Sequence, residues 1–287
     1  GHAALLLIKK GNSEINYFDF GRYITTYGNG RVRCKETDPD VEISIKAKFK
    51  NGKLSNLKDI LLWVENHPEK THGDGRLVAS IHNKIDFNKA ENYIHQLISK
   101  KEIPYGAFIK NGTNCARFVT DTIITSSTNK KISKQLKQSN LFTPSPIGNV
   151  IKGNTDNKIY TTYKQHFSEY KNRSITKEYK ASFFKSFKGE PNLIGTEQPN
   201  VNAFKLSNGT WLGGIGSGAW FHIEEKIDTK TYKVSRYNSL GVKDFETLFI
   251  IDKTCFNHKV AHQFIHPTNC KEVIIEQNNK IYNLLVG

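Results

Sequence analysis

The chain contains no methionine, and it begins at Gly1 without the basic region and cleavage pattern of a signal peptide. We therefore expect either that it is a fragment or that some residues of the protein are missing from the sequence. Removal of a targeting sequence, a disordered N-terminus or modified methionines left out of the sequence would each account for this. No apolar run approaches the roughly 18 residues that a membrane span requires, so no membrane span is expected. Free thiols favour the cytoplasm, but the sequence does not fix the compartment.

Cysteines are few: the 287 residues include four, and no two of them form a Cys-x-x-Cys pair. This number is too low for a disulfide scaffold. Potential zinc ligands are dense only near the C-terminus, with the spacing C-x2-H-x3-H-x3-H-x3-C. Pro267 and the β-rich surroundings argue against a helix long enough to align these histidines, so we predict scattered surface histidines, no metal and no cofactor. The set comprises Cys255, His258, His262, His266 and Cys270.

Acidic residues are also scarce, with 27 Asp and Glu against 42 Lys and Arg and a formal net charge of +15. Such a surface is expected to attract phosphates, anionic glycans or acidic lipids, including an anionic component of a cell envelope. Arg22, Arg31 and Arg33 are expected to be exposed, or else to hold an anionic group of a substrate. No zinc-finger spacing, RNP-type motif or arginine-rich arm is present, so no nucleic acid is expected as a partner. Nucleic-acid binding remains an alternative that predicts strong salt dependence.

The remaining composition, 37% hydrophobic with 11% aromatic residues, is sufficient for a full core. We predict an α+β fold in three parts. Residues 1–150 should form an antiparallel sheet with packed helices, and the alternation in residues 41–49 predicts a half-buried strand there. Residues 151–190 read as a linking, partly helical segment, with helix at about 160–188. Residues 191–287 contain short apolar runs between Asn-Gly, Gly-Gly and Asn-Asn turns, which predicts a smaller β-rich domain.

Two apolar stretches at the N-terminus, residues 3–8 and 15–20, flank a Gly11-Asn12 turn signal and predict a β-hairpin. If the chain folds back at this turn, residues whose numbers sum to about 23 face one another. Asp19 then lies next to Ala4, and it shares a face of the sheet with His2. The hairpin therefore brings a histidine and a carboxylate together.

Cys115 follows a turn at Gly112 and opens a run with helical spacing. Thr113 or Asn114 can cap the first free N–H groups of this helix. The partial positive charge at a helix N-terminus favours thiolate over thiol, and thiolate is the nucleophilic form. The alternative is a small buried residue at the start of a core helix.

A histidine held by a carboxylate and directed at a thiol is the arrangement of thiol hydrolases and acyltransferases. The order along this chain is a histidine on a strand, a polar residue on the next strand, and then N114-C115-A116-R117-F118-V119 opening a helix. This order resembles the circularly permuted NlpC-like branch of the papain fold, which includes the lecithin:retinol acyltransferase relatives with N-C-E-H-F-V. The resemblance covers residues 1–150, with Ala116-Arg117 in place of Glu-His.

The resemblance implies a thiol-dependent hydrolase that acts on an amide or ester of a small-molecule, peptide or acyl substrate. The implied catalytic residues are Cys115 as nucleophile, His2 as base and Asp19 as the group that orients His2. Oxyanion or substrate contacts are assigned to Tyr105, Asn114 and Tyr17. His72, in the loop THGDGR, is a rival base. Two alternatives remain, an inactive ligand-binding protein with a papain-like pocket and a lipid acyltransferase or thioesterase.

Overall fold

The computed structural model describes residues 1–287 except 72–75, 142, 172–175, 178–197, 203 and 253–255. Its architecture is α+β with antiparallel sheets, as predicted. The chain divides into two compact units. Unit 1 consists of Gly1–Gly21, Val41–Lys100 and Tyr105–Pro191, and unit 2 consists of Arg22–Asp40, Lys101–Pro104 and Asn192–Gly287. Among the described residues, no helix has the length and apolar character needed to cross a membrane.

Unit 1 begins with the predicted hairpin. Strands β1 (Ala4–Ile8) and β2 (Ile15–Gly21) pair antiparallel, with Ala4 opposite Asp19. Gly11 has a φ of 87°, a left-handed conformation that glycine adopts without steric cost in a tight turn. The register predicted from the position of the turn is therefore confirmed.

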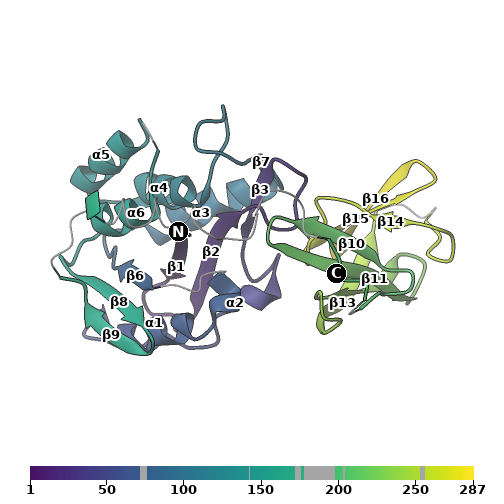
Figure 1. Ribbon diagram of the computed structural model, residues 1–287, viewed down its shortest axis with the longest axis horizontal. Helices are drawn as coiled ribbons and strands as arrows, with labels where there is room; N and C mark the ends of the chain where they lie inside the picture. The colour runs from purple at the N-terminus through teal and green to yellow at the C-terminus, as the bar shows by residue number, and fades with distance from the viewer. Residues whose placement is uncertain (72–75, 142, 172–175, 178–197, 203, 253–255) are drawn as a thin grey trace. The chain divides into compact units, whose positions relative to one another are not determined.

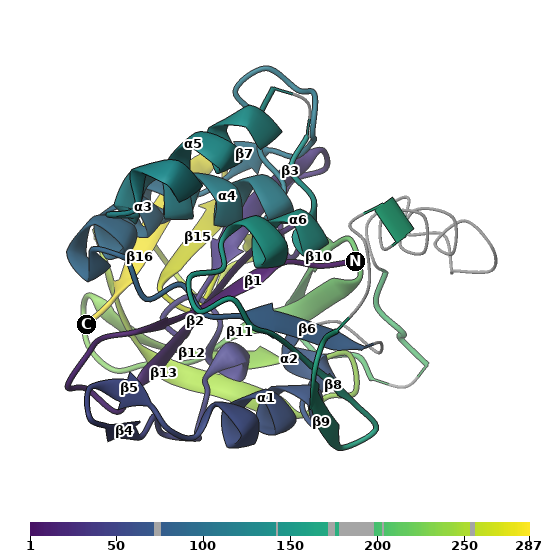
Figure 2. The same cartoon turned by 90° about the vertical axis from the view of Figure 1, so that its left-hand side faces the viewer.

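Three helices of unit 1 surround a central helix, α4. Helix α4 packs against β1 and β2 and is bordered by α3, α5 and α6 (Figures 1 and 2). Its Phe118 stacks on Phe20 of β2 with ring centroids 6.4 Å apart, and both side chains are fully buried. Burial of a side chain of this size stabilises a fold by roughly 1.5–3 kcal/mol. The helices are α1 (Leu57–Glu65), α2 (Pro68–Thr71), α3 (Phe87–Ser99), α4 (Cys115–Ser126), α5 (Lys130–Ser139) and α6 (Pro146–Lys152).

Two predictions for unit 1 are wrong. Residues 41–48 largely alternate between buried and exposed as expected, but Phe49 is exposed. Only Phe49–Lys50 (β4) pairs, with Lys53–Leu54 (β5), after the short helix η1 (Pro39–Val41). The rest of the stretch satisfies its backbone in other ways, for example through the Ala47 N–H, which donates to the Ser13 carbonyl.

The helix predicted at about 160–188 is replaced by strands in residues 159–163 and 166–169. Strands β8 (Ile159–Tyr163) and β9 (His166–Glu169) form a hairpin that pairs with β6 (Leu77–Ser80). The Tyr and Thr residues of β8 favour a strand, and this local preference outweighed the irregular hydrophobic pattern. Most of the remaining range, 172–175 and 178–188, lies outside the described residues.

The C-terminal part of unit 2 is the predicted β-rich region. Seven strands form one antiparallel sheet in the order β10-β11-β12-β13-β16-β15-β14. The two edge strands, β10 and β14, lie close to each other. The Phe264 N–H of β14 donates a hydrogen bond to Thr210 Oγ1 of β10 at 3.1 Å. Phe221, Tyr232 and Phe249 lie in the core that the sheet encloses. The strands are β10 (Thr210–Gly214), β11 (Ser217–Lys226), β12 (Thr231–Tyr237), β13 (Lys243–Ile251), β14 (Gln263–Phe264), β15 (Glu272–Gln277) and β16 (Lys280–Val286).

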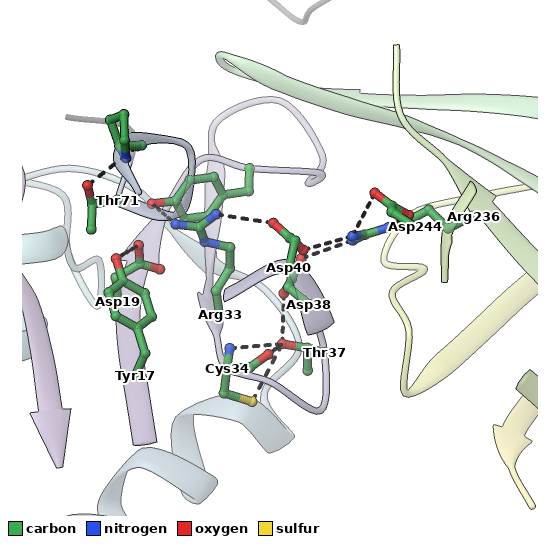
Figure 3. Close-up of polar contacts among 12 residues, drawn as sticks. Tyr17, Asp19, Arg33, Cys34, Thr37, Asp38, Asp40, Thr71, Arg236 and Asp244 are labelled. Atoms are coloured by element: carbon green, nitrogen blue, oxygen red, sulfur yellow. Dashed lines mark hydrogen bonds and ion pairs between the residues drawn. The ribbon is translucent and has the colours of Figure 1, made fainter. Parts of the chain in front are cut away.

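An N-terminal segment, Arg22–Asp40, also belongs to unit 2. It contains β3 (Asn29–Arg33), which pairs with β7 (Ile103–Pro104). Its charged side chains join a buried ionic network, in which Arg31 contacts Asp38 through two hydrogen bonds of 2.5 and 2.6 Å. Arg236 of β12 donates to Asp40 at 2.7 Å and to Asp244 at 2.8 Å (Figure 3).

Arg31 and Arg33 are therefore neither exposed nor available to a substrate, contrary to both expectations. They retain only 3% and 2% of their accessible surface. A buried guanidinium is tolerated only when it is paired and hydrogen-bonded. Here Asp38 pairs with Arg31, while Arg33 lies 4.0 Å from Asp40 and 3.8 Å over the ring of Tyr23.

Within unit 2, Gly214 provides a test of how closely Arg22–Asp40 is bound to β10. A Cβ at this position would lie 1.2 Å from the carbonyl oxygen of Tyr23. Because that obstacle is backbone, we expect Gly214→Ala to lower the free energy of unfolding by about 3 kcal/mol or more, as measured by urea denaturation. Gly106→Ala is the control, since its Cβ would meet only the half-exposed side chain of Ile109. Equal stability of the two variants would contradict the prediction.

Candidate active site

Cys115 is the first residue of α4, as the sequence predicts. Asn114 is the N-cap, with extended backbone and a side-chain oxygen that accepts from the Arg117 N–H at 2.9 Å. The choice between Thr113 and Asn114 as the cap is thereby decided. The thiol is 8% exposed and lies at the positive end of the helix, which favours its ionised form.

His2 links the thiol to a buried carboxylate. Its Nε2 lies 2.9 Å from Asp19 Oδ2, and the imidazole is also hydrogen-bonded to Cys115. The side chain of His2 is 25% exposed, whereas Asp19 is completely buried. The segment just before β1, strand β2 and helix α4 thus bring these three side chains together, and His2 lies outside the strand in which the sequence placed it.

The electrostatics of the pair favour charge separation. Burial lowers the pKa of His2, but hydrogen bonds to Asp19 and Cys115 and the charges of both partners outweigh it and raise the pKa to about 9. Burial raises the pKa of Cys115, but the hydrogen bond from His2, its positive charge and the Ala3 N–H outweigh burial and lower the pKa. These shifts favour a thiolate beside an imidazolium over a neutral thiol beside a neutral imidazole.

The three other predicted residues lie close to this arrangement in the fold. The Tyr17 hydroxyl donates to Asp19 Oδ2 at 2.8 Å and is 4% exposed, so it supports the carboxylate (Figure 3). The Asn114 side-chain oxygen is engaged in the cap. Tyr105 stacks on Phe20 with centroids 5.9 Å apart, and its backbone bridges to Thr113 just before the helix.

Two supporting groups escaped the sequence reasoning. The Ala3 N–H donates to the Cys115 sulfur, but a backbone amide has no residue-type signal. Asn149 of α6 is buried, donates to the Ala116 carbonyl at 2.8 Å and accepts from Thr120 Oγ1 at 2.6 Å. These bonds hold the first turn of α4, and nothing in the surrounding TPSPIGNV marks this asparagine.

The other described cysteines are electrostatically unlike Cys115. Burial raises the pKa of Cys34 to about 11, and burial also raises the pKa of Cys270. In the described part of the chain no group of three or more His, Cys, Asp or Glu side chains could hold a metal ion. Of the histidines near the C-terminus, His262 packs against the rings of Phe256 and Phe264. The rival base His72 and Cys255 lie outside the described residues.

The fold and the site together define an α+β chain with a helix-terminal thiol, an adjoining histidine and a buried carboxylate. Residues 1–132, which include all three groups, match a family described as Type VI secretion system effector TseH-like. This match is consistent with the NlpC-like resemblance of the sequence. Residues 209–286 match a family described as the DUF6695 C-terminal domain. No curated protein and no solved structure matches the chain.

Proposed function

We propose that this protein is a thiol-dependent hydrolase, of amidase or peptidase type, that cleaves an amide or ester through Cys115, His2 and Asp19. The match of residues 1–132 to the TseH-like effector family supports a papain-like cysteine hydrolase that acts as an effector. The position of His2 and Asp19 before Cys115 in the chain supports the permuted, NlpC-like order of the catalytic groups.

In this mechanism the Cys115 thiolate attacks the carbonyl carbon, and the carbonyl oxygen takes up the negative charge. The free N–H groups at the start of α4, including that of Cys115, stabilise this oxyanion. The His2 imidazolium then gives its proton to the leaving amine or alcohol, which leaves an acyl-thioester on Cys115. His2 next accepts a proton from water, which attacks the thioester and releases the acid and the thiolate. Asp19 holds the imidazole throughout.

One observation carries the proposal: the continuous hydrogen-bonded series from Cys115 through His2 to Asp19, with the pKa lowered at the thiol and raised at the imidazole. A cysteine that serves only to fill the core is expected to have a raised thiol pKa, because burial disfavours the thiolate, as it does at Cys34. The lowered pKa of Cys115 is the opposite of this.

The pH dependence of alkylation tests the proposal. We expect iodoacetamide to modify Cys115 rapidly below pH 7, with Cys34 and Cys270 unmodified, as read by mass spectrometry of peptides. In His2→Ala the reaction should require a higher pH, because the thiol loses its positive neighbour while its burial remains. An inert Cys115 would instead favour a ligand-binding protein.

The raised pKa of His2 also sets an upper pH limit for hydrolysis. Hydrolysis should decline as the pH rises through about 9, because His2 then loses the proton that the leaving group needs. The same shift stabilises the fold fully below the ordinary pKa of 6.5, and this contribution is lost as the pH rises through about 9. Parallel profiles of activity and urea midpoint against pH measure both effects. Activity that keeps rising beyond pH 10 would contradict this assignment.

A further inference from the structure

Helix α5 and its flanks carry positive charge only. No acidic residue occurs between Asp121 and Asp156, whereas five lysines do. Four of these are exposed on α5, opposite its buried Ile132 and Leu136. Among the described residues, none of the four forms an ion pair with a carboxylate. The four are Lys130, Lys131, Lys134 and Lys137.

The loop between β7 and α4 carries an uncovered apolar tip. Phe108 is 83% exposed and Ile109 is 50% exposed. The loop is nevertheless held in place, because the Gly106 N–H donates to Thr113 O at 2.9 Å and Arg117 Nη2 donates to Ala107 O at 2.8 Å. A fixed loop that presents large apolar side chains to water indicates an interaction surface rather than a part of the core.

These two features lie on the same side of unit 1. In both views α5 and the loop between β7 and α4 lie on the upper side of unit 1, and Figure 2 shows β4 and β5 on its lower side (Figures 1 and 2). Leu141, which follows α5 directly, is 79% exposed. We define the α5 face as the four lysines of α5 together with Phe108, Ile109 and Leu141.

We propose that the α5 face docks unit 1 onto the surface of an anionic lipid bilayer. Lysines attract the negative headgroups, and exposed aromatic and aliphatic side chains enter the boundary between headgroups and acyl chains. An acidic protein or a nucleic acid would satisfy the lysines as well, but neither offers an apolar phase to side chains that project singly from a loop. The proposal uses no residue of the thiol site and does not depend on the proposed hydrolase activity.

Co-sedimentation of the full chain with vesicles tests the proposal. We expect the protein to bind vesicles of phosphatidylcholine that contain about 30% phosphatidylglycerol. We expect little binding to vesicles of phosphatidylcholine alone. Each lysine near such a surface contributes roughly fivefold in affinity, so replacing all four by Gln should weaken binding by nearly three orders of magnitude, about 600-fold. Binding should also weaken as salt is raised.

A second variant separates lipid from other anionic partners. Phe108→Ser with Ile109→Ser should weaken vesicle binding by about tenfold without altering the charge. Unchanged vesicle binding in this variant, together with tight binding of the wild type to a short DNA duplex, would overturn the proposal in favour of a nucleic-acid surface.

The control removes the same charge elsewhere in unit 1. Replacing the exposed Lys46, Lys48, Lys50 and Lys53 by Gln lowers the net charge equally, in and just before the β4–β5 hairpin. This variant should bind vesicles like the wild type. If it loses as much affinity as the α5 variant, the attraction is a property of total charge and the assignment to α5 is wrong. A urea denaturation midpoint equal to that of the wild type would verify that each variant is folded.

Discussion

Replacing Cys115 by serine is expected to reduce hydrolysis of activated esters and amides by about 10⁴-fold or more. Serine keeps the shape of the side chain, but a hydroxyl beside His2 ionises far less readily than a thiol whose pKa is lowered. Covalent labelling by acyl-thiol probes should vanish at this position, as read by mass spectrometry. His2→Ala should cause a similar loss, and the double variant should be little worse than either, because the two groups act as one unit.

The matched control for this experiment is Cys34→Ser. Cys34 is buried, lies 3.1 Å from Glu36 Oε2, and has a pKa that burial raises to about 11. It should be silent to the probes and dispensable for hydrolysis. Asp19→Asn should reduce hydrolysis by up to about 10⁴-fold, since the imidazole keeps a partner but loses the negative charge that stabilises its protonated form. Full hydrolysis in Cys115→Ser would contradict the mechanism, whatever the substrate.

Replacing Arg236 by methionine is expected to lower the free energy of unfolding by about 3–5 kcal/mol. The guanidinium is 5% exposed and neutralises Asp40 and Asp244, with Asp38 at 3.7 Å. Its removal leaves the buried Asp38 and the partly exposed Asp40 and Asp244 without their shared positive partner. Urea denaturation measures the effect. Changing Asp40 and Asp244 to Asn in the same variant should restore part of the loss, because the unpaired charges are then gone.

Lys243→Met is the control, since Lys243 also joins acidic groups of the sheet but is 40% exposed. Water screens the ion pairs of Lys243 with Glu224 and Glu246, so the free energy of unfolding should stay within about 1 kcal/mol of the wild-type value. Acid provides a second test. Burial raises the pKa of Asp38, but the charge of Arg31 and its hydrogen bonds outweigh burial and lower it below 3.8. Its contribution to stability is therefore present above pH 3.8 and is lost as the pH falls further. Equal loss in Arg236→Met and Lys243→Met would refute the role of the buried network.

The parts of the fold that could be predicted from the sequence depend on short-range rules. Gly11 fixes the turn, the turn fixes the register, and the register brings Asp19 opposite Ala4. In the same way, a capping residue followed by helical spacing identified Asn114 and the start of α4 at Cys115. The contact of His2 with Asp19 followed from the hairpin, whereas its contact with Cys115 came from the family resemblance and not from spacing.

The parts that could not be predicted depend on partners distant in sequence. The sequence around Arg31 gives no sign of burial, because the network that neutralises the charges includes Arg236, which is far along the chain. Residues 41–49 alternate like a strand, but alternation reports which side chains are buried and not whether the backbone pairs. The catalytic roles of Cys115, His2 and Asp19 stay predictions until hydrolysis is measured.

Unit 2 combines Arg22–Asp40 and Lys101–Pro104 with the C-terminal strands. Its composition constrains how such proteins can be recombined. A gene fusion that exchanges only the last hundred or so codons would join one parent's β10 to the other parent's Tyr23 and one parent's Arg236 to the other parent's Asp40. Chimaeras that fold should therefore be those that take Arg22–Asp40 and the C-terminal strands from the same parent. We accordingly expect these two segments to be inherited together, although they are far apart in the gene.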